Sequence, residues 1–82
     1  MSITLQLSGY DKNTNLLAVE YPVPPREADY VKRVAAVDPA DTQVLGAYPL
    51  SETQVVSIAG AIDTPVNPKQ YRYFLEGYEN KD

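Results

Sequence analysis

The chain has 82 residues, of which 44% are hydrophobic, 22% charged and 10% aromatic. This length predicts a single small domain over residues 1–82, and the apolar share is too high for an intrinsically disordered chain. The 7 Lys and Arg residues and 11 Asp and Glu residues give a formal net charge of -4. Such a charge repels phosphate backbones and anionic membrane surfaces, so we expect neither nucleic acid nor a membrane as a partner.

The sequence contains no His and no Cys. It therefore lacks the usual general base, the usual thiol nucleophile, and the common ligands of zinc and iron–sulfur clusters. Glu20 and Glu76 are the only acids on predicted strands that are placed to face each other, but a catalytic carboxylate pair also needs a cleft. A chain of this length leaves little room for one. We predict no enzyme activity, no catalytic residues and no cofactor.

Asp11, Asn13 and Asn15 have the spacing of the first three oxygen ligands of an EF-hand loop. The glycine expected at the sixth position of that loop is Leu16, and the glutamate expected at the twelfth position is Pro22. Because the pattern fails at both positions, we predict a polar hairpin turn and no metal site.

Taken in chain order, residues 3–7 alternate apolar and polar side chains, which predicts a half-buried strand. Residues 9–15 are rich in turn formers, and residues 16–21 predict a second strand that pairs with the first as a hairpin. Apolar spacing over residues 25–37 predicts a helix that begins near Pro25 and ends at Asp38 and Pro39. Residues 43–48 predict a short third strand, closed by Pro49.

The clearest local signal comes from Ser51 and Gln54, which have the spacing of a capping box and predict a second helix from about residue 52. Residues 63–68 hold two prolines and end that helix. The aromatic stretch 70–78 predicts the last strand, and the charged tail 79–82 is expected to fray. The order is ββαβαβ, which predicts an α+β two-layer sandwich with a four-stranded sheet and two helices on one face.

The alternation of the last strand divides its side chains between two faces. Tyr71, Tyr73 and Leu75 form the more apolar set and should meet the helices. The opposite, open face then holds aromatic and charged side chains, which resembles the composition of protein interfaces. We predict a partner-binding site there that consists of Arg72, Phe74, Glu76, Tyr78 and Glu79.

Two readings of this aromatic strand stay open. In one, Phe74 and Tyr78 anchor another protein while acids such as Glu76, Glu79 and Asp82 steer a basic partner toward the face. In the other, the same side chains only pack across strands and bind nothing. A further alternative is a small structural or assembly subunit that associates with itself through strand edges or through the open face, for instance as a homodimer. The first residues lack the basic region and apolar run of a signal peptide, so we expect a cytoplasmic location.

Four stretches carry a resemblance to a known kind of protein. They are Tyr-Asp-Lys at 10–12, Glu-Tyr-Pro at 20–22, Tyr-Pro-Leu-Ser-Glu at 48–52 and Tyr-Arg-Tyr-Phe-Leu-Glu-Gly-Tyr at 71–78. With them the chain resembles a small uncharacterised bacterial domain family, similar to immunity-type proteins encoded near secreted toxins. The resemblance spans about Tyr10 to Tyr78 and implies a protein-binding role without catalysis. It assigns a function to no individual residue.

Overall fold

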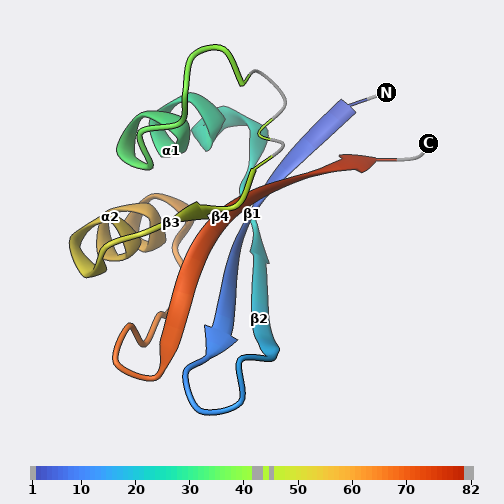
Figure 1. The fold of residues 1–82 in the computed structure, drawn as a ribbon. Helices are drawn as coiled ribbons and strands as arrows, with labels where there is room; N and C mark the ends of the chain where they lie inside the picture. The colour runs from blue at the N-terminus through green and yellow to red at the C-terminus, as the bar shows by residue number, and fades with distance from the viewer. Residues whose placement is uncertain (1, 42–43, 45, 81–82) are drawn as a thin grey trace.

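The structure, a computed structural model, describes residues 2–41, 44 and 46–80, and at positions 2, 79 and 80 it describes the backbone alone. Its elements follow the predicted order ββαβαβ. Four antiparallel strands form one sheet, and both α-helices lie against the same face of it (Figure 1). The predicted α+β two-layer sandwich is therefore confirmed.

The sheet has the strand order β2-β1-β4-β3. The strands are β1 (Ser2–Asp11), β2 (Leu17–Pro22), β3 (Tyr48–Pro49) and β4 (Tyr71–Asn80). The first and the last strand lie side by side at its centre and pair along their whole length, from Ser2 opposite Asn80 to Asp11 opposite Tyr71 (Figure 1). The centre of the sheet thus joins segments that are far apart in the sequence.

In the β1–β2 hairpin the first strand is longer and the turn shorter than predicted, because residues 8–11 continue β1, while β2 has the predicted length and is shifted by one residue. Gly9 permits this, since a Cβ at that position would lie 2.6 Å from Val19 Cγ2 and 2.9 Å from the Tyr73 ring. In the turn itself, Asp11 Oδ1 accepts hydrogen bonds from the backbone N–H groups of Asn13 (2.7 Å) and Thr14 (3.2 Å). The predicted polar turn is therefore confirmed.

The first helical segment is shorter than the predicted 25–37. It consists of the 3-10 turn η1 (Pro25–Glu27) followed by α1 (Ala28–Val34). Ala36 has a φ of 56°, a left-handed conformation that ends the helix before Val37. Val37 still packs against the core from outside the helix, which explains why its apolar side chain extended the predicted helical pattern.

The second helix, α2 (Glu52–Ile62), begins where it was predicted. Ser51 Oγ accepts a hydrogen bond from the backbone N–H of Gln54 (3.2 Å), and the Gln54 side chain accepts one from the backbone N–H of Ser51 (2.7 Å). The amide of Gln54 also donates to the carbonyl of Val34 (2.9 Å), so this side chain connects the start of α2 to the end of α1.

The third strand is shorter than the predicted 43–48, because among the described residues of this segment Tyr48 and Pro49 alone pair with β4. Residues 42, 43 and 45 lie outside the described residues. Val44 is buried, but its φ of 50° is incompatible with a strand. The Tyr48 hydroxyl donates to Asp41 Oδ2 (2.6 Å). Val44 itself is in no strand, so its apolar character reflects burial without regular structure.

The tail also departs from its prediction. We expected residues 79–82 to fray, but β4 extends to Asn80 and pairs there with Ser2. Residues 81 and 82, which include Asp82, lie outside the described residues.

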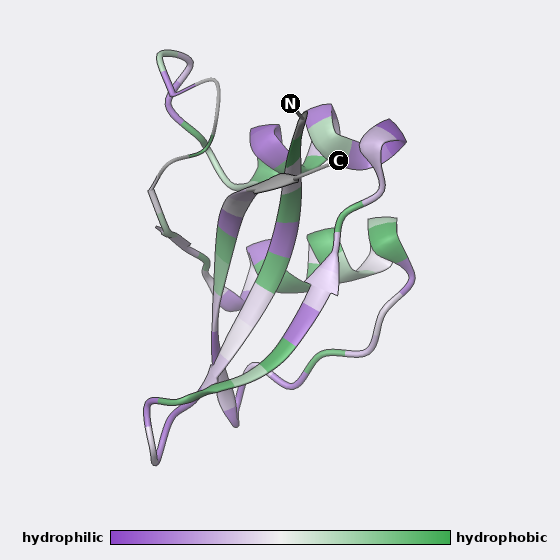
Figure 2. Ribbon diagram, turned by 90° about the vertical axis from the view of Figure 1, so that its right-hand side faces the viewer, coloured by the Kyte–Doolittle hydropathy of each residue, from purple (hydrophilic) through white to green (hydrophobic). Residues whose placement is uncertain are grey.

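The hydrophobic core fills the space between the helices and the sheet. The last strand contributes Tyr73 and Leu75 to it, and Tyr71 packs at its border, as the alternation predicted. From the other strands and the helices it includes Leu5, Leu7, Val31, Val55 and Ile58. Seen after a 90° turn that brings the right-hand side of Figure 1 to the front, the sheet lies before both helices, and no described element covers its near face (Figure 2).

Candidate functional site

The open face is the side of the sheet that points away from α1 and α2. Strand register arranges its side chains in four rows across the strands. Arg72, Phe74, Glu76 and Tyr78 all belong to it, as the alternation of β4 predicted, whereas the side chain of Glu79 lies outside the described residues. The rows hold Leu17, Tyr10 and Arg72; then Glu20, Ser8 and Phe74; then Pro22, Gln6 and Glu76; and last Thr4 and Tyr78.

Tyr10 and Glu76 are joined across these rows. The Tyr10 hydroxyl donates to the two carboxylate oxygens of Glu76 at 3.2 and 3.4 Å. The Tyr10 ring also meets Phe74 edge to face, with 5.5 Å between ring centroids and an interplanar angle of 87°. Ser8 lies in the row between those of Tyr10 and Glu76. It is fully buried and accepts a hydrogen bond from Gln6 Nε2 (2.8 Å). The middle of the face is therefore an ordered network.

The phenol of Tyr10 is held in its protonated form. Its pKa is raised above the ordinary value of 10.0 by burial first, and then by the negative charge of Glu76, by their hydrogen bond and by the charge of Glu20. All four effects disfavour a tyrosinate at this position. At neutral pH Tyr10 is therefore a hydrogen-bond donor, which suits a carboxylate acceptor.

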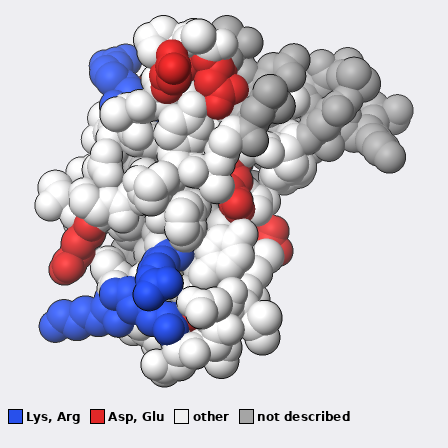
Figure 3. Space-filling view, in the orientation of Figure 1, with Lys and Arg blue, Asp and Glu red and all other residues white. Residues whose placement is uncertain are grey.

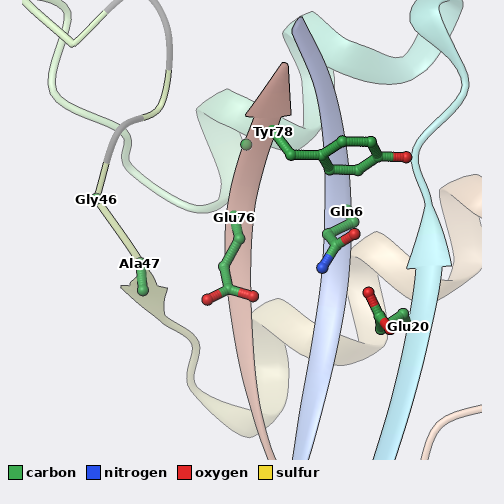
Figure 4. Close-up of a pocket in the computed structure, with 7 residues that line it drawn as sticks. Gln6, Glu20, Gly46, Ala47, Glu76 and Tyr78 are labelled. Carbon is green, nitrogen blue, oxygen red and sulfur yellow. The ribbon is translucent and has the colours of Figure 1, made fainter. Parts of the chain in front are cut away.

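A hollow of about 630 Å³ occupies the half of the open face nearer to Tyr78. Glu20, Gln6 and Glu76 point out from three neighbouring strands into it, and the Tyr78 ring extends from β4 across β1 (Figure 4). Gly46 and Ala47, which precede β3, line its edge on the outer side of β4 (Figure 4). Tyr78 is 43% exposed, so its aromatic ring is accessible to a partner beside the carboxylates of Glu20 and Glu76.

A second hollow of about 310 Å³ shares Ala47 and Glu76 with the first, so the two are adjacent. Tyr10, Phe74 and Arg72 give it an aromatic floor with a cationic end. The Arg72 guanidinium donates to Asn15 Oδ1 (3.3 Å) and is directed toward the hairpin turn. The open face thus runs from an acidic half to an aromatic half.

Charges are unevenly placed on the molecule. Among the described residues the ion pair within 4 Å is Arg26 with Glu27, at 3.9 Å on the helical side, so neither Glu20 nor Glu76 has a described cation in salt-bridge contact. Lys12 donates instead to the carbonyl of Pro68 (2.8 Å). On the side of the molecule that Figure 3 shows, lysine and arginine side chains gather at the lower end of the sheet, and others lie at the upper left.

Glu20 and Glu76 lie on β2 and β4 with β1 between them, which separates their strands by about 10 Å. Within the described residues, no group of three or more His, Cys, Asp or Glu side chains is placed to hold a metal ion.

The residues that β1 contributes to this site were not predicted from the sequence. Alternation along β4 alone predicted Arg72, Phe74, Glu76 and Tyr78. Gln6 and Tyr10 carry a usable signal, since they alternate with the apolar Leu5 and Leu7 and must therefore face away from the helices. What the sequence does not supply is the pairing of β1 with β4, which brings them against Glu76 and Phe74.

Fold and face together define a small α+β sandwich whose sheet is covered on one side. The chain belongs to the family described as "Domain of unknown function (DUF7683)", which matches residues 5–76. This match confirms the expectation of an uncharacterised domain family. Comparison with curated proteins and with solved structures gave no match. No helix in the described part of the chain is long and apolar enough to cross a membrane.

Proposed function

We propose that this protein is a non-catalytic protein-binding module that occludes a basic surface of another protein with its open sheet face. The observation that carries the proposal is the combination found there: the exposed Tyr78 ring beside two carboxylates, Glu20 and Glu76, with no described cation in salt-bridge contact. Aromatic side chains are frequent anchors of protein interfaces, and an acidic surface speeds encounter with a basic one.

Preorganisation of the face supports this role. Tyr10, Phe74 and Glu76 hold one another through a hydrogen bond and an aromatic contact, so they lose little conformational freedom on binding. A net charge of -4 adds long-range attraction for a basic partner.

The finer form of the proposal is an immunity or antitoxin-like protein of the bacterial cytoplasm. It rests on the resemblance of the motifs at 10–12, 20–22, 48–52 and 71–78 and on the acidic face, which would cover the basic site of a nuclease or similar toxin. Inhibition by occlusion requires no catalytic residue of the inhibitor.

A second candidate is a small assembly subunit that associates with itself. The observation in its favour is that Arg72 and Glu76 lie on one face with Phe74 between them, so a two-fold axis near Phe74 would pair each arginine with the partner copy's glutamate. Light scattering across a wide concentration range separates the candidates. A constant monomer mass removes the assembly subunit.

The test of the leading proposal is affinity capture from a source lysate with matched variants. Tyr78→Ala and the double variant Glu20→Gln/Glu76→Gln remove the anchor and the charges of the face. Tyr30→Ala is the control for the first, because Tyr30 on α1 is exposed to the same degree (42% against 43%). Glu52→Gln on α2 is the control for the charges. The proposal expects one basic protein that the wild type and both controls retain and both face variants lose.

A further inference from the structure

The larger hollow presents hydrogen-bond acceptors from three adjacent strands. Glu20 on β2 and Glu76 on β4 offer only acceptors when ionised. Between them on β1 lies Gln6. One of its two side-chain N–H donors bonds to Ser8 Oγ (2.8 Å), and its carbonyl oxygen is an acceptor. All three side chains point to the same side of the sheet (Figure 4).

The protein's own nearby cations are directed elsewhere. Arg72 lies on the same face but donates to Asn15 at the hairpin turn, and Lys12 donates to the Pro68 carbonyl. No described cation forms a salt bridge with Glu20 or Glu76, so among the described residues these carboxylates are open to a cation from another molecule.

We infer that the hollow receives the guanidinium group of an arginine from the partner protein. A guanidinium presents five N–H donors in a plane and so suits a hollow that offers several acceptors, whereas an ammonium is a compact point charge. The exposed Tyr78 ring beside the carboxylates adds a surface on which a planar cation stacks. The inference rests on the proposed function and names the group that its basic partner would insert.

The test uses three small probes in place of the partner: N-acetyl-arginine methylamide, the corresponding lysine compound and the corresponding citrulline compound. Citrulline has nearly the shape of arginine but no charge. Each is titrated into the isotope-labelled full chain at low salt and followed by NMR. The inference expects saturable shifts at the Gln6 side-chain amide and at the backbone N–H groups of Gly46 and Gly77, with arginine tighter than lysine and no saturation by citrulline.

Variants assign the binding to the hollow. Glu20→Gln/Glu76→Gln should weaken the arginine probe at least about tenfold, because both charge-assisted contacts become neutral. Tyr78→Ala should reduce the preference for arginine over lysine, because the surface on which the planar cation stacks is lost. The control Glu52→Gln, on the helical side, should bind as the wild type does.

Three results would overturn the inference: arginine binding that the double variant leaves unchanged, shifts that map to α1 and α2, or equal response to arginine and citrulline. Each is distinguishable from failure of the proposed function. If a basic partner is captured through the face while the arginine probe does not bind the hollow, the arginine inference fails and the proposed function stands. If the probe binds but no capture depends on the face, the proposed function fails.

Discussion

The Tyr10 hydroxyl donates to the Glu76 carboxylate on the neighbouring strand, although register places Tyr10 opposite Arg72 and Glu76 opposite Gln6. The phenol therefore runs diagonally past the row that holds Ser8 and Phe74. This diagonal contact fixes one of the two carboxylates of the acidic hollow and separates the hollow from the aromatic half of the face.

Replacing Tyr10 by Phe should remove this hydrogen bond while leaving the edge-to-face contact with Phe74. Because the bond is only partly buried and is 3.2 Å long, we expect the free energy of unfolding in urea to fall by about 0.5–1.5 kcal/mol. Tyr78→Phe is the matched control, because the Tyr78 hydroxyl makes no hydrogen bond with the described residues. It should change the free energy of unfolding less. Equal losses in the two variants would contradict the role of the Tyr10–Glu76 contact.

Stability should decrease in alkaline solution. The pKa of Tyr10 is raised chiefly by burial, that of Tyr48 by its hydrogen bond to Asp41, and that of Tyr73 chiefly by burial. Unfolded tyrosines lose their protons near pH 10, before these three do so in the folded protein. The unfolded state then binds fewer protons than the native state, so the free energy of unfolding declines as pH rises through and beyond this value.

Denaturant titrations at a series of alkaline pH values, run alongside the absorbance of tyrosinate, measure this slope. The variants Tyr10→Phe, Tyr48→Phe and Tyr73→Phe should each reduce it. A slope that the three variants leave unchanged would show that other groups govern alkaline unfolding.

Replacing two of the glycines by alanine should change the free energy of unfolding in opposite directions. At Gly9 a new methyl group would lie 2.6 Å from Val19 Cγ2, and we expect a loss of about 1–3 kcal/mol in the free energy of unfolding. At Gly60, an exposed position on α2 with nothing within 4 Å, alanine should stabilise the protein by about 0.5–1 kcal/mol through helix propensity. Thermal unfolding of the two variants side by side checks both signs. A destabilised Gly60→Ala or a neutral Gly9→Ala would contradict the packing described for each.

Replacing Gln54 should lower the free energy of unfolding more than replacing its capping partner Ser51. Ser51→Ala removes the cap and should cost about 1 kcal/mol. Gln54→Ala removes the reciprocal bond to Ser51 and also the bond to the Val34 carbonyl at the end of α1, so its cost should be larger. Urea unfolding of both single variants and the double variant measures this difference. A Gln54→Ala variant no less stable than Ser51→Ala would show that the contact with α1 contributes nothing.

The sequence was most informative where one local physical signal determined the outcome. Ser51 and Gln54 placed the start of α2, and strict alternation placed Tyr73 and Leu75 in the core. It misled where an apolar residue is buried without regular structure, as at Val44 in its loop and Val37 beyond α1. The candidate site depends on contacts between distant strands, such as Tyr10 with Glu76, and periodicity within one strand contains no information about its neighbour.

The pairing of β1 with β4 determines when, during synthesis of the chain, the open face is able to form. Every row of the open face contains a residue of β1, and the anchor and acid contributed by Tyr78 and Glu76 come from β4. During synthesis the chain therefore displays an unpaired β1 edge, protected at most by its hairpin partner, until β4 has left the ribosome. If the face binds a harmful partner, protection begins only when β4 has been translated and has docked, and no shorter nascent chain is able to provide it.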